Sequence, residues 1–348
     1  MEQKIVIAPL LGLIYIVSSA GETLTVKALN YNEVPLNLPT YTAFMSNQMW
    51  LFMIPAYWYL QRGKCLFDTK YMVQYMGMGV LTFAITLLRN ISVNVIPGSV
   101  FLLLISTSII FNMILSSVCL KKIFNRWHIA AGLTCLSSAL CIAVDVFFTN
   151  QESGSHSNFT LGVPTAIGAA FFIAVMSVWQ EQTQSKYDDI NLRVVEMTIV
   201  SSLLASILTV IFSFIIGEIG TWSYLIRRAE SNNSSLVICV SIALPILKLL
   251  VRNSKYSIIQ TSNAFFFEFI QSSSALFGSI ASIIIFQEPW GYGYVVSSIL
   301  LAASFAMYSH AKKIAKNTLI KPIFKDVEIE NPLKTLNFET IVVVSVWK

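Results

Sequence analysis

The stretch 264-AFFFEFIQSSSALFGSIASIIIF-286 decides the fold class, because it is long and apolar enough to cross a membrane although it carries a carboxyl group at Glu268. At 100° per residue, one face of such a helix is small and polar: Glu268, Gln271, Ser272, Ala275, Ser279 and Ser282. Large apolar residues face the other way: Phe266, Ile270, Phe277, Ile280 and Ile284. We expect the large face to meet lipid and the small face to meet other helices or water.

The whole chain has the composition of a membrane protein. Its 348 residues are 55% hydrophobic and 12% charged, with a mean hydropathy of +0.68, whereas soluble domains carry about 25% charged residues. The apolar stretches are continuous and about twice as long as the strands of a membrane barrel. The sequence therefore predicts an all-α polytopic membrane protein with ten transmembrane helices, at 5–28, 39–60, 71–88, 96–119, 127–148, 161–180, 194–217, 235–251, 262–286 and 291–311.

Basic residues predict the orientation of these spans. With both termini cytoplasmic, 19 of the 23 Lys and Arg residues fall on the cytoplasmic side. Three sequons on the opposite side make Asn158, Asn232 and Asn233 candidates for glycosylation, whereas Asn90 lies too close to the membrane.

A shift of 163 residues suggests an internal repeat. It brings Arg89-Asn90 onto Arg252-Asn253 and Trp127 onto Trp290, although exact matches are few and chance alignment is the alternative. Five spans are an odd number, so a second copy would enter the membrane from the opposite face. This predicts a 5+5 inverted repeat, with halves 1–149 and 150–316 and a flexible cytoplasmic tail 317–348.

Three segments carry a resemblance to a known superfamily: GLIYIVSSAGETLTVKALN (12–30), PGSVFLLLISTSIIFNMILSSVCLKKIFNRWHIAAGLTCLSSALCIA (97–143) and FFIAVMSVWQEQTQSKYDDINLRVVEM (171–197). They resemble the drug/metabolite transporter superfamily, with its EamA-like layout, and within it solute carrier family 35 F-type and chloroquine-resistance-transporter-like members, which share the fold of nucleotide-sugar carriers. The resemblance implies a carrier of a small organic solute, in an endomembrane (Golgi, ER, lysosome or vacuole) rather than the plasma membrane. Nucleotide-sugar carriers tend to have a Lys-Gly pair near the start of span nine, where this chain has Phe267-Glu268, which argues against a diphosphate substrate.

Polar residues inside three spans are the candidate solute contacts. A charge such as Glu268 costs at least about 2.5 kcal/mol at a helix centre, so we expect a hydrated cavity for solute or protons. The alternatives are a structural ion pair or neutral, hydrogen-bonded Glu, and a position of Glu268 nearer the membrane surface than the span bounds place it. Gln271 and Ser272 share its face. Ser108 and Asn112 share one face of span four, and we expect them either to line a cavity or to make interhelical hydrogen bonds. Asn47 and Gln48 are adjacent amides in span two and are predicted to contact solute.

Four charged residues near span ends are candidate gates or charge partners. Lys27 fits snorkelling to the interface better than a pair with Glu22 five residues earlier. Arg89 and Arg252 end spans three and eight as we predict them, and they suit interfacial anchoring or, as repeat mates, gating. Lys248 lies near a membrane end and suggests no special role.

Function follows from what the motifs exclude. The three histidines have no metal-ligand spacing, and no nucleotide-binding or hydrolase motif occurs, so we expect no enzyme, cofactor, metal site or ATP-driven transport. The prediction is a secondary-active transporter that works by alternating access, by proton coupling or exchange. The alternatives are a nucleotide-sugar antiporter and a non-transporting scaffold or receptor. The expected partners are a small solute and the lipid bilayer, a homodimer is compatible with this layout, and the net charge of +5 gives no reason for nucleic acid.

Overall fold

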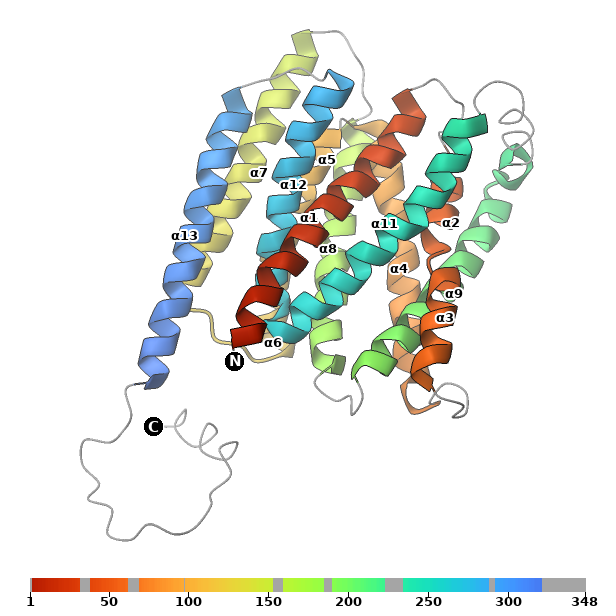
Figure 1. The fold of residues 1–348 in the computed structure, drawn as a ribbon. Helices are drawn as coiled ribbons and strands as arrows, with labels where there is room; N and C mark the ends of the chain where they lie inside the picture. The colour runs from red at the N-terminus through yellow and green to blue at the C-terminus, as the bar shows by residue number, and fades with distance from the viewer. Residues whose placement is uncertain are drawn as a thin grey trace, which may run out of the picture.

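The computed structural model describes residues 2–31, 38–61, 69–96, 98–152, 159–184, 190–222, 234–287 and 292–320, and this part of the chain contains helices and no strand (Figure 1). The helices are α1 (Glu2–Tyr31), α2 (Pro39–Asn47), α3 (Trp50–Gln61), α4 (Thr69–Val95), α5 (Gly98–Ile105), α6 (Ser108–Cys119), α7 (Arg126–Glu152), α8 (Phe159–Gln184), α9 (Ile190–Ile215), α11 (Ser234–Thr261), α12 (Ala264–Phe286) and α13 (Tyr292–Ile320).

The bundle has the polarity of a protein embedded in lipid. Six of the described helices are long and apolar enough to cross a membrane. Many large apolar side chains lie on the outside, such as Val17, Phe214 and Ile299 at 65–73% exposed, whereas many serines, threonines and amides are buried. The all-helical, multi-pass membrane architecture predicted from the sequence is therefore confirmed.

Two of the expected spans are interrupted. The span predicted at 39–60 is divided between α2 and α3, and the one at 96–119 between α5 and α6. At each break the backbone turns through short-range hydrogen bonds, such as Gln48 N to Met45 O at 3.1 Å and Thr107 N to Leu104 O at 3.1 Å. Backbone groups therefore stay paired at these breaks, as a non-aqueous environment requires.

Two predicted span ends are wrong. Spans three and eight were expected to stop at residues 88 and 251, next to an arginine, but α4 continues to Val95 and α11 to Thr261. Arg89 and Arg252 therefore lie within helices. A hydropathy pattern ends at a charge, whereas a helix continues through it when neighbouring helices supply partners for the charged group.

Helix α12 lies in the interior, and most of its predicted faces are confirmed. The Asn263 side chain caps its start by accepting a hydrogen bond from the Phe266 amide at 2.7 Å. The small polar face is buried throughout, while Phe277 and Ile284 are 57% and 71% exposed. The prediction for Ile270 is wrong, because it is buried in an apolar cluster with Tyr15 of α1.

The main helix contacts join the first part of the chain to the second. Helix α1 packs on α11 and α12, α4 on α8 and α9, and α7 on α13, while α5 and α6 contact α8 and α12. Each of these pairs joins a helix of the predicted half 1–149 to a helix of the half 150–316. The interior of the bundle therefore lies between the two predicted halves.

Candidate solute-binding cavity

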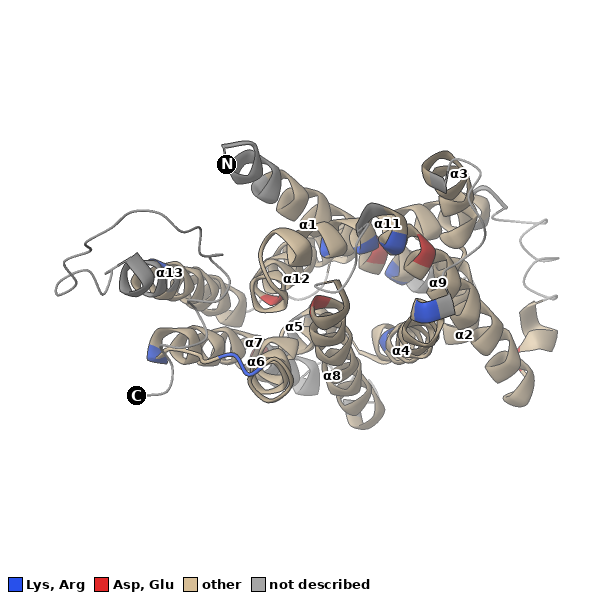
Figure 2. Ribbon diagram, turned by 90° about the horizontal axis from the view of Figure 1, so that it is seen from below, with Lys and Arg blue, Asp and Glu red and all other residues tan. Residues whose placement is uncertain are grey.

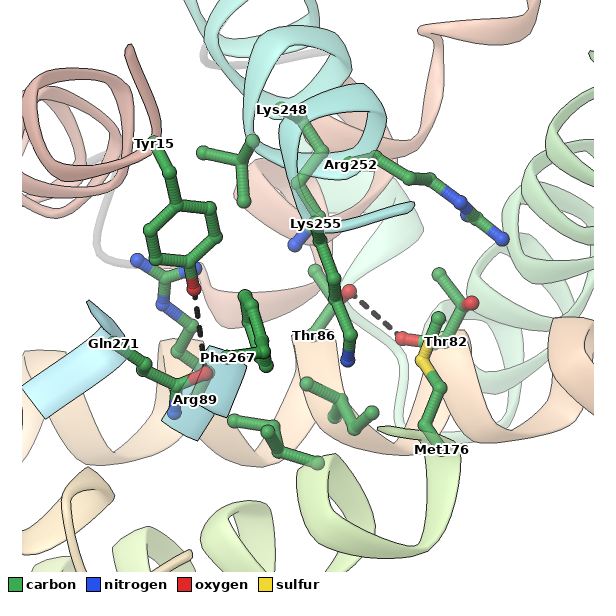
Figure 3. A pocket seen from close by; sticks show the side chains of 13 residues that line it. Tyr15, Thr82, Thr86, Arg89, Met176, Lys248, Arg252, Lys255, Phe267 and Gln271 are labelled. Carbon is green, nitrogen blue, oxygen red and sulfur yellow. Dashed lines mark hydrogen bonds between the residues drawn. The ribbon is translucent and has the colours of Figure 1, made fainter. Parts of the chain in front are cut away.

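A cavity lies inside the bundle where α1, α4, α8, α11 and α12 meet (Figure 3). The space between its atoms is about 540 Å³, a figure that includes its open mouth. A second space of about 360 Å³ shares Tyr15, Arg89, Ile173 and Gln271 with it. The lining of the larger space is Tyr15, Thr82, Ile85, Thr86, Arg89, Ile173, Met176, Lys248, Val251, Arg252, Lys255, Phe267 and Gln271.

Four basic side chains line this cavity. Arg89 comes from α4, and Lys248, Arg252 and Lys255 come from one face of α11, because spacings of four and three residues place side chains above one another. The three α11 residues are at most 9% exposed. Charged residues gather around α1, α4, α9 and α11 in the view along the bundle (Figure 2).

Glu22 of α1 neutralises part of this charge. Its carboxylate accepts from Arg89 Nη1 at 2.8 Å and from Lys248 Nζ at 3.1 Å, and it is 2% exposed. Arg89 also donates to Thr23 Oγ1 at 2.5 Å. One buried carboxylate therefore ties α1 to both α4 and α11, and the interpretation of Lys248 as an ordinary residue at a membrane end is wrong.

The other two cations have neutral partners. Arg252 donates through Nε to the Tyr256 hydroxyl at 2.7 Å and through Nη2 to Ser201. The Lys255 ammonium lies 4.8 Å from the ring centroid of Phe267, a contact that offsets about 0.5–2 kcal/mol of the cost of burying a cation. In the part of the chain that the structure describes, neither residue has a carboxylate within salt-bridge distance.

A neutral polar wall faces the cations. The Tyr15 hydroxyl donates to Gln271 Oε1 at 3.3 Å, and Gln271 Nε2 donates to Ser108 Oγ at 3.3 Å. The rings of Tyr15 and Phe267 meet edge to face with centroids 5.0 Å apart. The cavity thus offers an amide that donates and accepts, a phenol and aromatic surface, which suits a flat polar heterocycle.

The carboxyl of Glu268 lies behind this wall. It is fully buried and accepts from Ser108 and from Asn112 Nδ2, the latter at 3.2 Å. Ser272 donates to the Glu268 backbone carbonyl at 2.9 Å. The structure therefore brings five predicted site residues together, of which Gln271 lines the cavity and the other four support it.

Other predicted site residues lie elsewhere. Gln48 donates to Phe44 O at 3.2 Å at the α2–α3 break, and neither it nor Asn47 lines the two cavities. Lys27 Nζ donates to Ser282 Oγ at 3.4 Å, between the last turns of α1 and α12. The predicted glycosylation residues are outside the described part of the chain: Asn158, Asn232 and Asn233.

Sequence reasoning missed six of the polar and aromatic lining residues, namely Tyr15, Thr82, Thr86, Lys248, Lys255 and Phe267. The spacing of Lys248, Arg252 and Lys255 was a usable signal, since three cations on one face of an apolar helix indicate a polar interior. This signal was missed because the predicted span ended at residue 251, so that Arg252 and Lys255 fell in a loop.

Comparisons with known proteins correct the expected family. No curated protein matches the chain. One solved structure, described only as "Crystal structure of protein", aligns at a TM-score of 0.57 and 13% identity, covering 88% of this chain and 98% of the other, which indicates a shared fold. Among protein families, residues 4–318 match the one described as "Purine nucleobase transmembrane transport" (PUNUT).

This match overturns the assignment to the drug/metabolite transporter superfamily and solute carrier family 35. The segments behind that assignment are rich in small and apolar residues, which the lipid environment imposes on many carriers. The family is one of transporters, so the chain is not an enzyme and it moves a small solute across a membrane. The chain belongs to the purine nucleobase transmembrane transport family.

Proposed function

We propose that this protein carries a purine nucleobase across the membrane, and that the base binds in the cavity between α1, α4, α8, α11 and α12. The observation that carries the proposal is the cavity lined by Gln271, Tyr15 and Phe267 in the interior of a membrane bundle. A purine is flat and aromatic, with hydrogen-bond donors and acceptors along its edges. An aromatic ring can cover its face while an amide pairs with its edge.

The second element of the proposal is an inverted repeat of residues 1–149 and 150–316. Under the 163-residue shift, Ser108 corresponds to Gln271, and these two side chains are hydrogen-bonded at 3.3 Å. Arg89 corresponds to Arg252, and both line one cavity. These contacts are expected when two related halves meet around an axis.

Helix packing supports the same symmetry. If α1 corresponds to α8 and α4 to α11, the contact of α1 with α11 has its counterpart in that of α8 with α4. The contact of α1 with α12 likewise matches that of α8 with α5 and α6. Counting α2–α3 and α5–α6 each as one interrupted span reduces the described helices to ten, the number that the repeat requires.

Alternating access then follows from rocking of the two halves about the cavity. Glu268 stands one turn before Gln271 and shares Ser108 with it, so uptake or loss of a proton at Glu268 would be felt by the residue that contacts the base. We propose that this carboxyl couples transport to protons.

We also propose that both termini are cytoplasmic. Setting aside the four cavity cations, sixteen basic residues remain on the side of the termini and three on the other. The expectation of an endomembrane came with the superfamily resemblance and loses that support, as does the nucleotide-sugar substrate. The family is one of transporters, which argues against the non-transporting scaffold.

Counterflow of labelled hypoxanthine in proteoliposomes tests the function. The purified protein should accumulate hypoxanthine against an internal load of the same base. Thr86→Trp, at a buried position of the lining, should abolish this by filling the cavity. Val80→Trp is the matched control on the same helix, since Val80 is 51% exposed on the outside, and it should transport normally. Equal counterflow by both variants, with both folded, would contradict the proposal.

A further inference from the structure

We infer that the cavity selects a purine in anionic form, with the negative charge held by the Lys255 ammonium. This inference rests on the proposed function and specifies the chemical class of its substrate. It starts from the charges of the cavity. Four cations line it, and no acidic residue is among the described lining residues.

The carboxylates that the structure describes around the cavity do not balance these cations. Glu22 is shared by Arg89 and Lys248, so it neutralises one of the two charges. Glu268 acts on Lys255 from α12, but the pair is not within salt-bridge distance, and its two oxygens accept from Ser108 and Asn112. The lining therefore keeps an excess of positive charge in an environment that strongly disfavours unpaired ions.

Lys255 is the cation best placed to meet a substrate. Arg252 uses its guanidinium on Tyr256 and Ser201, and Lys248 is held by Glu22. Lys255 is 7% exposed and its ammonium lies within the cavity over the Phe267 ring, with no described carboxylate in salt-bridge distance (Figure 3). An ammonium offers three donors, and a ring face makes no conventional hydrogen bond with them, so an anion in the cavity would complete its bonding.

The neighbouring groups fit a flat, base-sized anion. The Phe267 ring beside Lys255 and the Gln271 amide supply aromatic contact and edge recognition next to the charge. A deprotonated oxopurine combines these properties, since its charge is spread over a planar ring. A nucleotide also carries negative charge, but its phosphate and ribose require additional room.

The test compares two purines that differ in charge and hardly in shape. Purine-6-carboxylate is an anion at neutral pH and purine-6-carboxamide is neutral. Each is used to compete against counterflow of labelled hypoxanthine by the full-length protein. We expect the carboxylate to compete about 10- to 100-fold more strongly, the range for one charge-assisted hydrogen bond.

Variants locate the effect. Lys255→Met should remove the preference, so that the ratio between competition by the carboxylate and competition by the carboxamide falls to about one. Lys255→Arg should retain the preference, and Lys313→Met, which removes an exposed cation of α13, should behave like the wild type. Because the carboxylate and carboxamide are first compared on the unaltered protein, the test does not depend on a variant that folds.

Each outcome has a separate meaning. Hypoxanthine counterflow with equal competition by the two purines would overturn the anion inference and leave the proposed function standing. Stronger competition by adenosine monophosphate than by purine-6-carboxylate would also overturn it, in favour of a nucleotide site. No counterflow and no competition by any purine would contradict the proposed function itself.

Discussion

Replacing Glu22 with glutamine removes a buried carboxylate that pairs with two cations, the buried Lys248 and the partly buried Arg89. Arg89 and Lys248 donate to it at 2.8 and 3.1 Å, and Glu22 is 2% exposed. Glutamine keeps the shape of the side chain but leaves both cations without their counter-charge. Removing one partner of a buried ion pair costs about 3–5 kcal/mol, and we expect a loss of that size in the free energy of unfolding of Glu22→Gln.

The neighbouring variants should rank in a defined order. Lys248→Met leaves the Arg89–Glu22 pair intact, so it should lose less than Glu22→Gln. The double variant that combines Glu22→Gln with Lys248→Met leaves only Arg89 without its counter-charge, instead of both cations. It should therefore be more stable than Glu22→Gln alone, by a coupling free energy of about 0.5–3 kcal/mol. Lys122→Met is the control, because its ion pair with Glu181 is partly exposed and worth at most about 1 kcal/mol.

The assay is unfolding of the purified protein by sodium dodecyl sulfate in mixed micelles, followed by the fluorescence of its seven tryptophans. A midpoint for Glu22→Gln equal to that of the wild type would refute the reasoning. So would a double variant less stable than Glu22→Gln, since the second cation would then not be the cause of the loss.

Three further predictions concern other positions. Gly278→Val should reduce the yield of folded protein, because a Cβ atom at Gly278 would lie 2.7 Å from Leu102, whereas Gly132→Ala, with its nearest neighbour at 3.8 Å, should be tolerated in the same expression test. Glu268→Gln should abolish the pH dependence of purine uptake in proteoliposomes without loss of folded protein, and retained pH dependence would remove Glu268 from coupling. Asn158 should become glycosylated when the protein is synthesised into microsomes. Termini found in the lumen, with Asn158 unmodified, would contradict the proposed orientation.

Much of the fold could be predicted from the sequence because lipid leaves few choices. Long uncharged stretches specified helices, and the pattern around Glu268 specified which side of α12 is buried. The sequence also selected Glu268, Ser108, Asn112 and Gln271, which lie within one hydrogen-bonded group. Polar side chains inside a span find hydrogen-bond partners mainly in one another, because the surrounding lipid offers none.

The remainder depended on partners that one segment does not reveal. A charged residue in a hydropathy pattern indicates the end of a span unless its counter-ion is known. The counter-ion of Arg89 is Glu22, which lies 67 residues earlier in the chain and is not evident from the segment around Arg89. Asn47 and Gln48 have the composition of solute contacts, yet they lie at a helix break that hydropathy does not detect. The family was missed because small and apolar residues are common to carriers with different substrates.

Photolabelling tests directly whether the solute binds between the two halves. An azido-substituted purine should attach to peptides of α4 or α12 that contain Thr86, Phe267 or Gln271, and excess hypoxanthine should prevent the attachment. Attachment confined to other helices, or attachment that hypoxanthine does not reduce, would contradict binding in this cavity.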